Sequence, residues 1–282
     1  MGMNKEDRIK VFENTVEICN DGVYENENNE VVEIDSSDFS ADTKFYGKKV
    51  VLNYDSMARY DMDVRVTNND TLYEAEELIN KGFKVCVLNM ASKHTPGSDV
   101  TYGSTSQESE IFRRTNIFKS LFEFHYIGTQ YGIDNQREER YPLERTFGGI
   151  YTPNVTVFKY GEDKDYALMD KPFQVNVITL SPLKNPPKDE NGKILPWAER
   201  MTKDKIRQIL DIALENGNNA LVLGAFGCGV HNNTDPIEMS RFFADVLSSE
   251  EYQGLFKMIR FAVLDDCNTE RSNYLSFKET FG

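Results

Sequence analysis

Apolar side chains recur at helical spacing in three stretches of the chain, residues 5–22, 70–82 and 202–217. Each stretch ends at a glycine, the residue that most often closes a helix. Two further helices are predicted, one over residues 107–124 and one after Asp235, a capping residue that Pro236 follows in the first turn. The apolar pattern therefore predicts helices along the whole chain.

Between the helices, apolar residues form short, nearly continuous runs, the pattern of strands buried on both faces. The clearest runs begin at residues 83, 173, 219 and 257, and weaker candidates cover 31–34, 48–56, 63–70 and 147–159. Strands alternate with helices from about residue 70 to residue 266, which predicts an α/β fold with a largely parallel sheet. No repeat or linker divides the sequence, so we expect one domain over residues 1–282, with residues 1–45 as an N-terminal helical extension packed on it.

The composition and net charge of the chain limit which kinds of molecule it is expected to bind. The chain has 282 residues and a formal net charge of −14. This charge argues against an electrostatic grip on nucleic acid or an anionic membrane, although backbone N–H groups can still hold a small anion. The four cysteines and three histidines lack disulfide or metal-ligand spacing, so we expect no metal and no cofactor. Without a signal peptide or a long apolar run, the expected location is cytoplasmic.

Two glycine-containing loops leave the ends of predicted buried strands, the edge at which α/β sheets bind ligands. The first, "ASKHTPGSDVTYGSTSQESE", covers residues 91–110, and the second, "GAFGCGVHNN", covers residues 224–233. Glycine spacing in the second loop lets the backbone bend and present successive N–H groups, a cradle for a diphosphate. Tight turns explain the same glycines equally well, and spacing alone does not decide between the two explanations.

The sequence from Val66 to Leu121 resembles the microbial-type poly(ADP-ribose) glycohydrolases, whose hallmark is a Gly-Gly-Gly loop followed by Gln-Glu-Glu. Three later blocks, "GGIYTPNVTVFK", "VNVITLSPLKN" and "ALVLGAFGCGVHNN", resemble that family in the right order. The resemblance covers about residues 5–266. It implies a macrodomain-like three-layer α/β/α sandwich with a mixed, mostly parallel sheet, which binds ADP-ribose in a cleft between the two loops.

Carried over by position, the resemblance assigns ligand contacts to both loops. It places Asn89 at the distal ribose, and Gly97, Ser98 and Asp99 where three glycines line the diphosphate. Gln107, Glu108 and Ser109 stand at the Gln-Glu-Glu motif, whose first glutamate orients ribose hydroxyls. The second loop contributes Gly224, Ala225, Phe226, Gly227, Cys228, Gly229 and Val230 at the diphosphate, and His231 near the adenosine.

Two departures from the family pattern bear on catalysis. Ser98 and Asp99 put side chains where backbone would approach phosphate, and an ionised Asp99 would repel it. Ser109 replaces the glutamate that, in the family, protonates the departing ribose oxygen and activates water. General acid–base help of this kind is worth about 10²–10⁴-fold, and a serine hydroxyl does not titrate near neutral pH. Glu110 lies about 100° further around the helix and is not a replacement.

The sequence therefore predicts a macrodomain protein that binds ADP-ribose or a related nucleotide, free or attached to a macromolecule, within NAD metabolism. Hydrolysis of poly(ADP-ribose) is expected to be impaired. The alternative is an active hydrolase of an ADP-ribosyl linkage, with Glu108 or Asp99 as the catalytic carboxylate. A third reading is an interaction module that has lost the ligand. Ser109 is also explained as a helix N-terminal residue, and Asp99 as a turn residue.

Overall fold

The structure, a computed structural model, describes residues 2–34, 42–134, 137–229, 234–265 and 272–282. Its contacts divide the chain into two units, each assembled from separate stretches of sequence. Unit 1 comprises Met1–Phe45, Ala91–Leu143 and Ile150–Thr179, and unit 2 comprises Tyr46–Met90, Glu144–Gly149 and Leu180–Gly282. That the whole chain is one domain stays a prediction.

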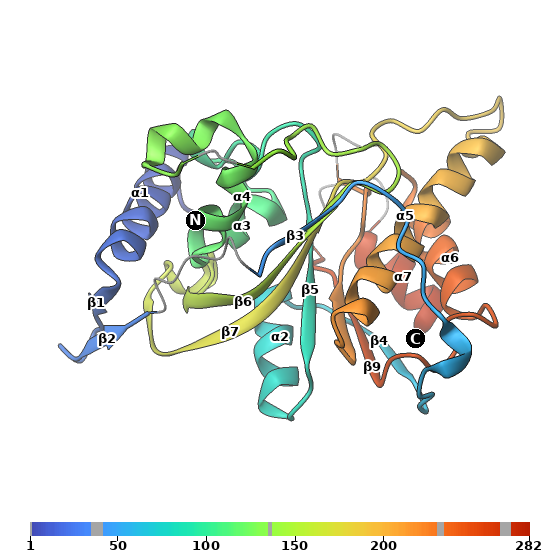
Figure 1. The fold of residues 1–282 in the computed structure, drawn as a ribbon, viewed down its shortest axis with the longest axis horizontal. Coiled ribbons are helices and arrows are strands. Elements are labelled where there is room, and N and C mark those ends of the chain that lie inside the picture. The colour runs from blue at the N-terminus through green and yellow to red at the C-terminus, as the bar shows by residue number, and fades with distance from the viewer. Residues whose placement is uncertain (1, 35–41, 135–136, 230–233, 266–271) are drawn as a thin grey trace. The chain divides into compact units, whose positions relative to one another are not determined.

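Unit 1 begins with helix α1 (Lys5–Asp21), which the left-handed Gly22 closes as predicted. The antiparallel hairpin of β1 (Val23–Glu25) and β2 (Val31–Glu33) follows. The other α-helices and strands among its described residues are β3 (Lys44–Tyr46), α3 (Gln107–Arg114), α4 (Ile117–Leu121), β6 (Gly149–Lys159) and β7 (Leu168–Leu180) (Figure 1). The ring of Phe12 on α1 lies 6.4 Å from that of Phe112 on α3 and 6.1 Å from that of Phe118 on α4. These buried rings fix the N-terminal helix to α3 and α4.

Unit 2 contains four parallel strands in the order β5-β8-β9-β4. They are β4 (Asp63–Thr67), β5 (Val85–Met90), β8 (Ala220–Leu223) and β9 (Met258–Ala262). The helices of this unit are α2 (Thr71–Asn80), α5 (Pro196–Glu215), α6 (Pro236–Leu247) and α7 (Asn273–Phe281) (Figure 1). The predicted α/β class with a mixed, mostly parallel sheet is confirmed.

Strand β9 shows how helices cover the parallel strands of unit 2. The Arg260 Nε atom lies 3.7 Å from the Glu74 carboxylate of α2. The ring of the next residue, Phe261, lies 5.1 Å from Phe243 of α6 and 5.2 Å from Phe277 of α7. Because successive strand residues point to opposite faces, α2 covers one face and α6 and α7 cover the other. Unit 2 by itself is therefore layered helix–sheet–helix.

Two expected elements are wrong. The helix expected over residues 107–124 ends at Arg114, because Thr115 is extended and bridges to Val157, and a separate helix starts at Ile117. The strand expected at residues 48–56 does not form. There the Val50 N–H donates to the Gln208 side chain at 3.1 Å, and residues 54–56 make a 3-10 turn.

Every helix within the described residues is too short or too polar to cross a membrane.

Candidate functional site

The first candidate loop lies in unit 1, between Ala91 and the start of α3 at Gln107. Gly97 and Ser98 both have left-handed backbones, with φ of +80° and +51°. A Cβ on Gly97 would lie 2.8 Å from the Phe112 ring, so this position requires glycine, whereas Ser98 adopts the same conformation at a cost of about 1–2 kcal/mol. Asp99 is exposed and precedes the 3-10 helix η2 (Val100–Tyr102) without a side-chain cap bond.

Glu108, the retained carboxylate, holds the main chain of this loop. Its Oε1 accepts the Gly97 N–H at 3.0 Å, and its Oε2 accepts the Ser92 N–H at 2.7 Å. The side chain is buried, at 1 % exposure. Burial and this nearby carboxylate raise the pKa of Tyr141 well above its ordinary value. Both Glu108 oxygens therefore accept hydrogen bonds from backbone N–H groups, and these two bonds fix the main chain at Ser92 and Gly97.

Ser109 forms a further hydrogen bond to this loop. Its hydroxyl donates to the Gly97 carbonyl oxygen at 3.2 Å and accepts from the Ser106 hydroxyl at 2.9 Å. Ser106 is also the N-cap of α3 and accepts the Ser109 N–H. Ser109 has no exposed surface. The residue at the expected catalytic glutamate position thus joins the helix cap to the glycine turn.

Glu110 binds side chains that lie outside this loop. Its Oε1 accepts from the Arg113 guanidinium at 2.8 Å and from the Tyr166 hydroxyl at 2.6 Å. Gln107 is the first residue of α3 and is half-buried. Arg113 and Arg114 are both buried, so neither is a solvent-facing phosphate ligand.

Ser92 and Ser106 have roles that the sequence analysis missed. Ser106 could have been found as a serine cap just before an apolar helix. Ser92 carries no such local signal, since its N–H meets Glu108 only in three dimensions.

The second candidate loop lies in unit 2, directly after β8. Gly227 has a left-handed backbone, with φ of +76°. The N–H of Phe226 donates to the Gly224 carbonyl at 2.8 Å, and that of Cys228 donates to the Ala225 carbonyl at 3.0 Å. These two amides therefore form turns within the loop. That the loop holds a diphosphate stays a prediction.

Of the other ligand residues expected in unit 2, the structure describes Asn89, Cys228 and Gly229. Asn89 is fully buried, one residue before the end of β5. A Cβ on Gly229 would meet no atom within 4 Å, so the main chain there is open. Burial raises the pKa of the Cys228 thiol, which disfavours the nucleophilic thiolate. Val230 and His231 lie outside the described residues. No group of three His, Cys, Asp or Glu side chains among the described residues could hold a metal ion.

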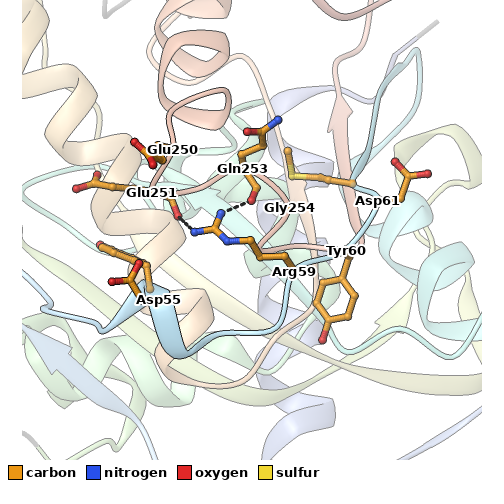
Figure 2. A pocket seen from close by; sticks show the side chains of 10 residues that line it. Asp55, Arg59, Tyr60, Asp61, Glu250, Glu251, Gln253 and Gly254 are labelled. Atoms are coloured by element: carbon orange, nitrogen blue, oxygen red, sulfur yellow. Dashed lines mark hydrogen bonds between the residues drawn. The ribbon is translucent and has the colours of Figure 1, made fainter.

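Unit 2 also contains a pocket of about 880 Å³. Its walls carry the carboxylates of Asp55, Asp61, Glu250 and Glu251 (Figure 2). Arg59 projects among them, and its guanidinium donates to the carbonyl oxygens of Glu251 and Gln253 (Figure 2). Because this arginine is bound to the main chain and carboxylates surround it, the pocket is unsuited to an anionic diphosphate.

The family model described as "Microbial-type PARG, catalytic domain" matches residues 12–160, slightly more than half of the chain. Among solved structures, poly(ADP-ribose) glycohydrolase from Thermomonospora curvata bound to the inhibitor ADP-HPD is 25% identical, with a TM-score of 0.78 over 98% of this chain and 100% of that chain. Poly(ADP-ribose) glycohydrolase from Deinococcus radiodurans in complex with ADP-ribose is 27% identical, with a TM-score of 0.62 over 78% of this chain and 84% of that chain. No curated protein matches. The chain therefore belongs to the microbial-type PARG catalytic-domain family.

Proposed function

We propose that this chain binds ADP-ribose, free or attached to a macromolecule, and hydrolyses poly(ADP-ribose) poorly. Family membership and the solved relatives, one in complex with ADP-ribose and one with the inhibitor ADP-HPD, support the binding part. One observation carries the rest: the residue at the expected general-acid position is a buried serine whose hydroxyl bonds the Gly97 carbonyl.

Each unit by itself offers a candidate loop for the proposed ligand contacts. Gly97 and Ser98 follow each other in the left-handed conformation, which turns the main chain sharply. The open main chain at Gly229 leaves room for a phosphate, and Asn89 would contact the distal ribose. A chain of net charge −14 gains little from long-range attraction of an anion, so close backbone donors must supply the affinity.

Poor hydrolysis follows from the protonation chemistry. Cleavage of the ribose–ribose bond needs a proton donor at the departing oxygen and a base for water. Ser109 cannot supply either near neutral pH. Glu108 is buried with a backbone N–H on each carboxylate oxygen, and Glu110 is bound to Arg113 and Tyr166. The described contacts of all three side chains are therefore with groups of the protein itself.

Two measurements on the full chain test the proposal. Calorimetric titration with ADP-ribose should show saturable heat, and ADP, which lacks the distal ribose, should bind more weakly. Release of ADP-ribose from poly(ADP-ribose) should be at least ~10²-fold slower than for the Thermomonospora curvata enzyme. Absence of heat at millimolar ADP-ribose would refute the binding part, and equal turnover would refute the impairment.

Asp99 supports one alternative, an active hydrolase with a relocated carboxylate. Its side chain is exposed and makes no cap bond to η2, so it has the freedom to meet a substrate. In this case Asp99→Asn would abolish release of ADP-ribose from an ADP-ribosylated protein, and Asp55→Asn, at an exposed aspartate outside both loops, would not. If Asp99→Asn retains full activity, Asp99 is not the catalytic acid.

A further inference from the structure

The ligand loop, defined here as residues 97–106, is held at both ends by helix α3. Glu108 and Ser109 bind Gly97 at its start. At its other end, the Ser104 carbonyl accepts a hydrogen bond from the guanidinium of Arg113, one turn further along the same helix. A single short helix therefore fixes the separation of the two loop ends.

Arg113 uses its whole guanidinium for this purpose. Besides Ser104, it donates to the Arg8 carbonyl of α1 at 3.2 Å and to Glu110 at 2.8 Å. The side chain is completely buried, and Glu110 neutralises its charge. Three acceptors in three directions match the planar fork of a guanidinium, which the point charge of a lysine cannot reproduce.

Helix α1 supplies the surface on which the loop rests. Gly103 has φ of +72°, and a Cβ there would lie only 2.4 Å from the Lys5 carbonyl oxygen. The loop main chain thus lies directly against the first turn of α1. Glu162 fixes this part of α1. Its carboxylate accepts hydrogen bonds from the Arg8 guanidinium at 2.8 and 2.9 Å and from the Met3 N–H at 2.8 Å.

We infer that Arg113 is a positioning residue for the ligand loop and that α1 is part of the same support. The inference rests on the proposed function, because Gly97, Ser98 and Asp99 of this loop are the proposed ligand residues. Loss of the Arg113–Ser104 bond frees one loop end, so the loop must be ordered when the ligand binds. The entropy of that ordering opposes binding.

The test compares Arg113→Lys with Lys119→Met in the full chain. Lys119 donates to the Cys19 carbonyl near the far end of α1, so its removal deletes one bond to α1. The first turn of α1, against which the loop lies, keeps its contacts at Lys5 and Arg8. Amide hydrogen exchange of residues 97–104 should be at least about tenfold faster in Arg113→Lys and unchanged in Lys119→Met. ADP-ribose affinity should fall about 10-fold or more only in Arg113→Lys.

The two readouts separate this inference from the proposed function. If the unmodified chain does not bind ADP-ribose, the proposed function fails, but exchange in the loop still tests positioning. Unchanged exchange of residues 97–104 in Arg113→Lys would overturn the positioning role. So would equal losses of affinity in the two variants, since general destabilisation would then explain both. If Arg113→Lys fails to fold, Glu110→Gln provides a second test, because it removes the charge that pairs with Arg113 and leaves residues 97–106 unaltered. Faster exchange of residues 97–104 in this variant would support the positioning role, and unchanged exchange would overturn it.

Discussion

At the scale of a single residue, the proposed impairment of hydrolysis depends on Ser109. Its replacement by glutamate would restore a titratable group and remove the bond to the Gly97 carbonyl. We expect Ser109→Glu to raise poly(ADP-ribose) cleavage by about 10²–10⁴-fold, because the missing contribution is general acid–base catalysis. Because Ser109 has no exposed surface, the larger side chain should also lower the free energy of unfolding by about 1–3 kcal/mol or more.

Ser109→Gln is the matched control, since it has nearly the same shape and no titratable proton. Cleavage assays and thermal melts on both variants separate chemistry from packing. Equal, low activity of the glutamate and glutamine variants would show that the serine is not what limits hydrolysis.

Gly97 and Ser98 are adjacent left-handed residues with different surroundings. A Cβ on Gly97 would collide with the Phe112 ring, whereas Ser98 already carries one. We expect Gly97→Ala to lower the free energy of unfolding by about 2–5 kcal/mol, from the left-handed backbone and the overpacked ring together. Ser98→Ala should change it by less than about 0.5 kcal/mol. Denaturant titration measures both, and similar losses would contradict the Phe112 contact.

At the scale of elements, the start of α3 organises the first candidate loop. Ser106 accepts the Ser109 N–H and donates to the Ser109 hydroxyl. Ser106→Ala should therefore cost about 0.5–2 kcal/mol of stability, the usual value of an N-cap. Thr105→Ala, at the exposed neighbouring position, is the control and should be close to neutral. Thermal unfolding of the two variants checks the prediction, which fails if they melt alike.

Elements with a strong local signal could be predicted from the sequence. The Asp70 side chain caps α2 at the Leu72 and Tyr73 N–H groups, and the apolar run at residue 83 forms β5. The break after Arg114 could not be predicted, because it depends on a bridge from Thr115 to Val157, far along the chain. Helix α7 (Asn273–Phe281) was also missed, since the rings of Phe277 and Phe281 contact a distant residue, Phe261.

For the candidate site, the sequence was enough to find the motif residues, but the hydrogen bonds that these residues make could not be predicted from it. Glu108 accepts N–H groups from Ser92 and Gly97, and both bonds cross more than ten residues of loop. No periodicity or spacing encodes such contacts. The two glycine loops were found because left-handed backbones favour glycine, and Gly97 and Gly227 have that conformation.

At the scale of the whole molecule, one buried charge in unit 1 gives stability a pH dependence. Lys159 is 2 % exposed and donates to the Val11 carbonyl, Asn14 and Thr15. Burial lowers its pKa to about 7. Between this value and the unfolded pKa near 10.5, the unfolded chain binds more protons, so stability rises with pH in that window.

Stability should therefore increase by about 2 kcal/mol from pH 7 to pH 9. Denaturant unfolding at the two pH values measures the change, and the rise should be lost in Lys159→Met, whatever its absolute stability. A rise that persists in this variant would assign the pH dependence to other groups.

The division of each unit into separate stretches also sets an order of events during protein synthesis. Unit 1 has all of its residues once Thr179 is made, whereas β5 of unit 2 must wait for β8, which begins at Ala220. During that interval the apolar segment Val85–Met90 emerges without its β8 partner. Unpaired apolar strands promote aggregation, so we expect the growing chain to be most prone to aggregation in this interval.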